Sequence, residues 1–146
     1  MLGGNKAETM RSWVAAISKF DVETAFTYCT DDVEWLTPHG HFKGKSGMEN
    51  YINWLKDNVQ DFKNVESGHG IMVEGDRAFF EHTMSGIMQG EQVEFLAICT
   101  YEFEGEKISR LKTVFDRLSI ADQATNQWLP KKLVNTIINQ MEKGLH

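Results

Sequence analysis

Basic residues, cysteine and long apolar runs are all scarce in this sequence. Its 15 Lys and Arg residues are outnumbered by 21 Asp and Glu, for a formal net charge of -6. Proteins that bind nucleic-acid backbones need clustered Lys and Arg to displace counterions, so no nucleic-acid partner is expected. No apolar run approaches the roughly 20 residues that span a bilayer, and the opening MLGGNKAETM lacks the basic and apolar regions of a secretory signal. We therefore expect a cytoplasmic protein with no membrane partner.

The two cysteines, Cys29 and Cys99, do not form a CxxC pair. This spacing argues against structural zinc, and a disulfide would be unusual in a reducing compartment, so both are interpreted as thiols. The 146 residues have a globular composition, 41% hydrophobic and 25% charged. Because the sequence contains no repeat, low-complexity tract or proline-rich linker, a single domain over residues 1–146 is predicted.

Helical periodicity dominates the beginning of the sequence. Apolar residues recur at three- and four-residue steps over residues 7–20, and Asp21 is placed to cap a second short helix over residues 22–28. An alternating strand is predicted at residues 33–37, and a third amphipathic helix at residues 44–59.

The second half of the sequence has the alternation of strands. Four such segments, joined by short turns that contain glycine, predict an antiparallel meander over residues 65–73, 77–88, 92–103 and 108–118. A final apolar stripe predicts a helix over residues 130–143, which must cover some other surface. The elements together predict an α+β fold with a hollow between the helices and the sheet.

This order of elements resembles the cone-shaped fold of the nuclear transport factor 2-like superfamily. That superfamily includes ketosteroid isomerase, limonene epoxide hydrolase, scytalone dehydratase and SnoaL-like polyketide cyclases. The resemblance covers about residues 7–122 and is carried by the segments WVAAISKFDVETAFTYCTDDVEWLTPHG, VEGDRAFFEH and EGEKISRLKTVFDRL. It implies a curved antiparallel sheet wrapped around the N-terminal helices, a cystatin-like α+β barrel, with the C-terminal helix as an addition. Since this fold hosts many activities, function must be argued from the site.

The resemblance to ketosteroid isomerase also implies which positions face the cup. That enzyme's tyrosine, general base and protonated aspartate would fall on Trp13, Thr37 and Cys99. None of these three residues can serve as that enzyme's base.

Two other members of the superfamily imply acid-base candidates. The relay of the epoxide hydrolase would fall on His82, Met84 and Thr113, of which only His82 is an acid-base group, and strand parity turns His82 toward the cavity. His82 is therefore predicted to be catalytic, the alternative being a buried neutral histidine hydrogen-bonded to a hydroxyl or a carbonyl. A SnoaL-like cyclase implies an acidic residue near the end of the last strand, here Asp116. The alternation of the strand turns Asp116 outward, away from the cavity. The alternative to a catalytic role for Asp116 is therefore an ion pair with Arg117.

Aromatic, methionine and small side chains occupy the alternate positions that face the predicted cavity. His39 is expected at the mouth of this cavity. Small residues on this face favour leftover space over a filled core. The predicted ligand-binding set is Trp13, Trp35, Thr37, His39, Met48, Phe80, Met84, Phe95, Ala97, Cys99, Thr113 and Phe115. We expect the hollow to hold a small, largely apolar molecule and no cofactor.

A metal site is not predicted. His39 and His41 flank Gly40, but a metal needs three or four convergent donors, and this spacing does not supply them. Asp31 and Asp32 lie between a helix and a strand, where carboxylates commonly accept hydrogen bonds from turn amides.

Three hypotheses follow for function. The first is a cofactor-free acid-base enzyme of the isomerase, dehydratase, cyclase or hydrolase type that acts on a small apolar molecule, with Thr37 and Thr113 orienting the substrate or water. The second is a non-catalytic module that binds a hydrophobic ligand. The third is a protein-interaction dimer with a filled interior. Apolar Leu96, Ile98 and Val114 on the outer sheet face predict a homodimer through that face.

Overall fold

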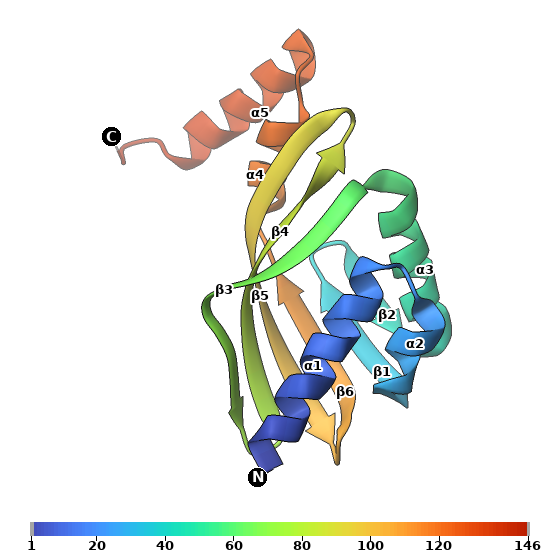
Figure 1. Cartoon of the computed structure of the whole chain (residues 1–146). Coiled ribbons are helices and arrows are strands. Elements are labelled where there is room, and N and C mark those ends of the chain that lie inside the picture. Colours follow the sequence, from blue (N-terminus) through green and yellow to red (C-terminus); the bar gives the residue numbers. More distant parts are fainter. Residues whose placement is uncertain (1, 146) are drawn as a thin grey trace.

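The computed structural model describes residues 2–145 and confirms the α+β class (Figure 1). The helices in this part of the chain are α1 (Leu2–Ser18), α2 (Val22–Thr27), α3 (Gly44–Asn58), α4 (Arg117–Ala124) and α5 (Trp128–Met141). The strands are β1 (Cys29–Thr37), β2 (Gly40–Lys43), β3 (Gln60–Glu74), β4 (Arg77–Met88), β5 (Glu91–Glu104) and β6 (Lys107–Val114).

All six strands form one sheet in the order β2-β1-β6-β5-β4-β3. The predicted antiparallel meander is present as β3 to β6, and β4 has the predicted bounds. The sheet is mixed because β1 pairs with β6 in parallel, whereas β2 folds back on β1 as an antiparallel hairpin. A parallel pair needs a long crossover, and here the chain from α3 to β5 supplies it.

Several elements differ from the sequence-based prediction. The strand β1 begins at Cys29 and not at residue 33, so Asp31 and Asp32 lie within the strand and not in a turn that would supply amide donors. The hairpin strand β2 has only four residues, too few to show alternation. The edge strand β3 begins at Gln60, earlier than predicted, because its pairing with β4 is interrupted by register shifts at two places that hide its period. The last strand ends at Val114, and the helix α4 takes the place of its predicted continuation to residue 118.

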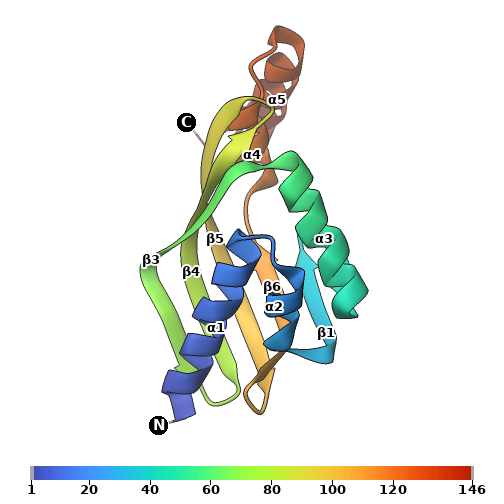
Figure 2. The same cartoon turned by 45° about the vertical axis from the view of Figure 1, so that its right-hand side comes forward.

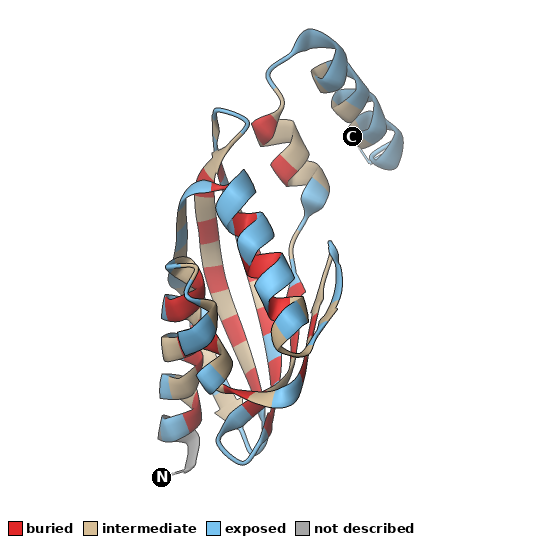
Figure 3. Cartoon of the chain, turned by 90° about the vertical axis from the view of Figure 1, so that its right-hand side faces the viewer, coloured by how far each residue is buried: buried red, intermediate tan, exposed pale blue. Residues whose placement is uncertain are grey.

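Helices α1, α2 and α3 cover one face of the curved sheet (Figures 1 and 2). The long strands turn alternate residues toward these helices, and Figure 3 shows the resulting bands of burial along the sheet. Trp35 joins the layers: its ring lies edge-on to Trp13 of α1 at 5.0 Å and to Tyr51 of α3 at 4.7 Å. Full burial of such apolar side chains stabilises the fold by about 2 to 3 kcal/mol each.

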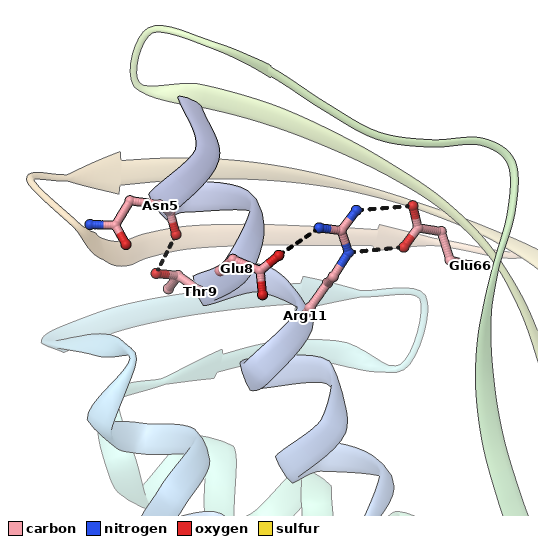
Figure 4. A network of polar contacts seen from close by, with 5 residues as sticks. All are labelled: Asn5, Glu8, Thr9, Arg11 and Glu66. Atoms are coloured by element: carbon pink, nitrogen blue, oxygen red, sulfur yellow. Dashed lines mark hydrogen bonds and ion pairs between the residues drawn. The ribbon is translucent and has the colours of Figure 1, made fainter. Parts of the chain in front are cut away.

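A charged contact links α1 to the edge strand on the surface (Figure 4). Arg11 Nε donates to Glu66 Oε2 at 3.2 Å, and its Nη1 donates to Glu8 Oε1 at 2.8 Å. The hydrogen bond from Arg11 lowers the pKa of the Glu66 carboxyl below its usual value. Because these groups are exposed, the contact orients α1 and adds little to stability.

The C-terminal helix α5 projects away from the sheet and the other helices (Figures 1 and 2). It has no buried residue, and most of its apolar side chains are exposed, Trp128 by 74% and Leu133 by 58%. The helix therefore buries none of its side chains fully against its own chain, and only Val134 and Ile138 among its apolar residues are partly covered. Over residues 2–145, no helix is both long and apolar enough to cross a membrane.

Candidate functional site

Two neighbouring cavities lie between the helices and the sheet. The inner cavity has a volume of about 30 Å³, and the outer cavity has a volume of about 270 Å³. The residues that line both cavities are Tyr51, Leu55, Phe62, Met84 and Phe115. The inner space holds about one water molecule. Only the outer space is large enough for an organic ligand, near the lower end of the range of about 300–1,000 Å³ for small-molecule pockets.

A run of buried polar groups lines the inner cavity. Trp35 Nε1 donates a hydrogen bond to Thr113 Oγ1 at 2.9 Å. Cys99 Sγ lies 3.3 Å from Thr113 Oγ1 and 3.2 Å from His82 Nε2. These residues come from β1, β6, β5 and β4, so the alternation of four strands brings them to one point.

The hydrogen bond at the other ring nitrogen of His82, Nδ1, fixes the tautomer of the ring. Asn64 Nδ2 donates to Ser18 Oγ at 3.2 Å, which leaves Asn64 Oδ1, an acceptor, facing His82 Nδ1 at 3.0 Å. The proton of the neutral imidazole is therefore on Nδ1, and Nε2 accepts. The Cys99 thiol lies within hydrogen-bond distance of two acceptors, His82 Nε2 and Thr113 Oγ1, and its single proton can be donated to either one. Both ring nitrogens of His82 are thus occupied.

Burial keeps the inner groups neutral. His82 is 4% exposed, and its ring stacks on Phe80 with centroids 4.5 Å apart. This burial lowers the pKa of His82 to about 4 and raises the pKa of the Cys99 thiol to about 12. At neutral pH the imidazole is uncharged and fully hydrogen-bonded, and the thiol is not a nucleophile.

The outer cavity has mostly apolar and aromatic walls. Its lining residues come mainly from the C-terminal half of α3, the ends of β4 and β5 that meet at their turn, and α4. Gly86 permits this corner to close, because a Cβ there would lie 2.4 Å from Val59 Cγ1 and 3.0 Å from the Gln60 carbonyl oxygen. Burial raises the pKa of Tyr51 on its wall to about 12, so that hydroxyl stays protonated.

His39 lies at the rim of the outer cavity, in the turn between β1 and β2. Its ring centroid is 4.9 Å from that of Trp54 and 5.3 Å from that of Phe115. Partial burial, and secondarily the charge of Arg117, lower the pKa of His39 below its usual value, so it is neutral at pH 7. Among residues 2–145, no side chain or backbone group hydrogen-bonds to its ring nitrogens, which leaves one donor and one acceptor for a ligand.

The structure divides the predicted ligand-binding residues between the two cavities. The inner cavity is lined by Trp13, Trp35, Met84, Cys99, Thr113 and Phe115, together with His82. The outer cavity is lined by His39, Met84, Phe95 and Phe115.

Four residues of the predicted set line neither cavity. Met48, Phe80 and Ala97 are buried by close neighbours, so their inward parity places them in the core. Thr37 acts within the turn, where its hydroxyl oxygen accepts from the His39 backbone N–H at 3.0 Å. Inward parity thus identifies the buried face but does not identify which part of that face is hollow.

Asp116 lies outside both cavities and is exposed. Its carboxylate caps α4 by accepting from the backbone N–H groups of Leu118 and Ser119 at 2.9 and 3.2 Å. The expected ion pair with Arg117 is not formed, since no contact joins their charged groups in the described chain.

Sequence reasoning missed two contributors to the site. Asn64 fixes the tautomer of His82, but its strand is irregular and nothing in the local pattern marks it. Helix α4 closes the outer cavity, and it has a readable signal: Asp116 as a cap, followed by Ile120 and Ala124 on one helical face.

Within the part of the chain that the structure describes, no three His, Cys, Asp or Glu side chains converge to hold a metal. His41 points to Glu34, with Nε2 at 3.6 Å from Oε1, and not to His39. Asp21 caps α2 as predicted, accepting from the Thr24 N–H at 3.0 Å.

A family model described as a SnoaL-like domain matches residues 10–111. The chain therefore belongs to the SnoaL-like domain family, as the resemblance implied. The comparison with curated proteins gives no match.

Solved structures share the fold at low sequence identity. A Catenulispora acidiphila protein with a ketosteroid isomerase-like fold, in complex with trimethylamine, is 15% identical with a TM-score of 0.74, covering 80% of this chain and 92% of that one. TerC, co-crystallised with polyporic acid, is 16% identical with a TM-score of 0.74, covering 82% and 98%. An epoxide hydrolase from M. tuberculosis, like limonene epoxide hydrolase, is 16% identical with a TM-score of 0.67, covering 95% and 96%. At these identities the similarity shows the fold alone.

Proposed function

We propose that this protein binds a small, largely apolar molecule of one or two rings in the outer cavity. The observation that carries the proposal is a 270 Å³ space with aromatic walls and a few polar groups at its rim. Such a combination is typical of ligand sites, in which apolar walls supply affinity and sparse polar groups fix orientation. Two of the similar structures hold small molecules, which supports this use of the fold.

Cofactor-free proton transfer on the bound molecule is the second candidate function, with His39 as the acid-base group. Its imidazole is neutral near pH 7 and has both nitrogens available beside the cavity. His82 could act only on a substrate group that enters the inner cavity and displaces the Cys99 thiol from Nε2. Asp116 takes no part in this scheme, because its carboxylate caps α4. No cofactor is required.

Binding can be tested by titrating the protein with neutral naphthalene derivatives, followed by calorimetry and tryptophan fluorescence. Trp54 lies in the cavity wall, so binding should quench its emission, and the Trp54→Phe variant should lose most of that change. Ala121→Phe is expected to fill the cavity and abolish binding, because Ala121 lines it from α4.

Leu118→Phe is the matched control, since Leu118 lies on the same helix but does not line the outer cavity. Failure of every derivative to bind, or equal binding to Ala121→Phe and to the unaltered protein, would overturn the proposal.

Homodimerisation through the outer sheet face is a separate part of the proposal. Leu96 and Val114 lie on that face and are 52% and 63% exposed, and both line a shallow surface recess with Ile98. Light scattering should report a dimer, and Leu96→Lys should convert it to a monomer. Leu133→Lys on α5 should leave the dimer intact; a monomer from that variant alone would move the interface to the exposed face of α5.

A further inference from the structure

The mouth of the outer cavity carries charge of one sign. Arg117 lines the cavity at the start of α4, and no Asp or Glu is among the described residues that line it. This is notable in a chain whose formal net charge is -6. The net charge of the chain disfavours anions overall, whereas a guanidinium on a cavity lined by no carboxylate of residues 2–145 attracts an anion locally.

The guanidinium of Arg117 is available to a ligand. Within residues 2–145 it makes no ion pair or hydrogen bond, in contrast to Arg11, which contacts Glu8 and Glu66. The neighbouring carboxylate, Asp116, is occupied by the backbone N–H groups that it caps. An unpaired guanidinium beside an apolar space is suited to a carboxylate, which it can bind through two parallel hydrogen bonds.

His39 stands on the same rim, close enough to Arg117 for that charge to act on it. Its neutral ring can donate one further hydrogen bond to an anionic oxygen. Behind these two groups, the rings of Trp54, Phe95 and Phe115 form walls against which a planar ring can pack.

From this arrangement we propose that the ligand of the outer cavity is a small aromatic carboxylate. Its ring lies among the aromatic walls, and its carboxylate stays at the mouth between Arg117 and His39. The inference rests on the proposed function, since it specifies the ligand of the same cavity. An aromatic cavity can also hold a cation over its ring faces, but that occupant would face Arg117 with like charge and would find no carboxylate.

The test uses three probes of matched shape: 2-naphthoate, neutral 2-naphthamide and cationic 2-naphthylmethylammonium. Calorimetry at pH 7.5 and low salt should rank the anion first, about 10-fold tighter than the amide, with the cation weakest. Added NaCl should weaken binding of the naphthoate and leave that of the amide nearly unchanged.

Arg117→Gln should reduce naphthoate affinity by about 10-fold while amide affinity changes less than about 2-fold. Arg117→Lys should retain part of the preference, because it keeps the charge and loses the paired hydrogen bonds. Arg110→Gln is the matched control: it removes the same charge from a residue that lies beside Glu34 and away from the cavity.

Each result decides between distinct conclusions. Equal binding of naphthoate and naphthamide, or a preference for the anion that survives Arg117→Gln, would overturn this inference and leave the ligand-binding proposal standing. Tightest binding of the ammonium probe would overturn it in favour of a cation held by the aromatic walls. If none of the three probes binds, the proposed function of the cavity fails, and this inference fails with it.

Discussion

His82 and His39 lie beside adjoining cavities, yet their surroundings give them opposite properties. His82 is buried on β4, with one ring nitrogen bonded to Asn64 and the other to Cys99. His39 lies in a surface turn, touches aromatic rings and has both nitrogens free within the described chain. The inner histidine is thus built into the fold, while the outer one is placed to meet a ligand.

The difference between the two histidines shows that a strand position that faces a cavity does not by itself identify a reactive group. A histidine in a low-dielectric interior loses its charge, and a complete set of hydrogen bonds leaves it nothing with which to bind a substrate. A histidine at the edge of an apolar space keeps its hydrogen-bonding capacity. Its neutral state also matches the requirement of a general base near pH 7.

The largest expected effect is a loss of stability in acid that depends on His82. Its pKa is about 4 in the folded state, against an ordinary value of 6.5, so below pH 6.5 the unfolded chain binds the proton first. The stabilisation is complete above pH 6.5 and falls as the pH is lowered to 4, by about 3 kcal/mol. Urea unfolding across this range should therefore show a steeper decline for the unaltered protein than for His82→Gln.

His39→Gln is the control for this titration. The pKa of His39 is also lowered, but by only partial burial and the charge of Arg117, so this variant should remove a smaller part of the decline in acid than His82→Gln does. Parallel curves for the unaltered protein and His82→Gln would show that the imidazole at position 82 is protonated as readily in the folded state as in the unfolded chain.

Gly86→Ala should have the second-largest effect on stability, and it should act at the corner that closes the outer cavity. The added methyl group would meet Val59 Cγ1 at 2.4 Å and the Gln60 carbonyl oxygen at 3.0 Å, so the corner between α3 and β3 must shift. Overpacking of this kind costs about 1 to 3 kcal/mol in unfolding free energy. The double variant Gly86→Ala/Val59→Ala should be more stable than the sum of the two single losses predicts, and simple additivity would contradict the contact.

The fold could be predicted from the sequence because its long strands and amphipathic helices have clear periods. The segment that became β4 alternates without interruption, and Asp21 is a typical cap. The edge strand β3 was predicted too short, since its register shifts near Glu66 break the alternation on which strand prediction depends. The parallel pairing of β1 with β6 joins segments far apart in sequence, and no local pattern encodes it.

The site was less predictable than the fold, for a physical reason. Alternation gives the direction of a side chain, but whether space remains beside it depends on how the helices pack. Met48 and Phe80 face inward and fill the core, whereas His39 and Phe95 face a cavity that α4 closes. The partners of His82 come from other strands, so its neutral, fully bonded state required the three-dimensional arrangement.

Thr113→Val should have a moderate effect and tests the inner polar groups without changing side-chain shape. It removes the acceptor of the Trp35 indole N–H and the hydroxyl next to Cys99, and leaves the indole donor buried without a partner. Such a loss costs about 1 to 3 kcal/mol. Urea unfolding should show it, while the exposed Thr100→Val should be nearly neutral; equal effects would mean that the Thr113 hydroxyl contributes nothing specific.

The smallest expected change in stability comes from His39→Gln, and this variant sharpens the contrast between the two histidines most directly. Its exposed ring accepts and donates no hydrogen bond within residues 2–145, so unfolding free energy should change by less than about 0.5 kcal/mol. Affinity for 2-naphthoate should nevertheless fall several-fold, because the flexible glutamine amide does not hold its N–H donor where the rings of Trp54 and Phe115 fix the imidazole N–H. His82→Gln should leave that affinity nearly unchanged. If instead His39→Gln destabilises the fold and binds 2-naphthoate as before, the outer imidazole is the structural one, and the roles assigned to the two histidines are reversed.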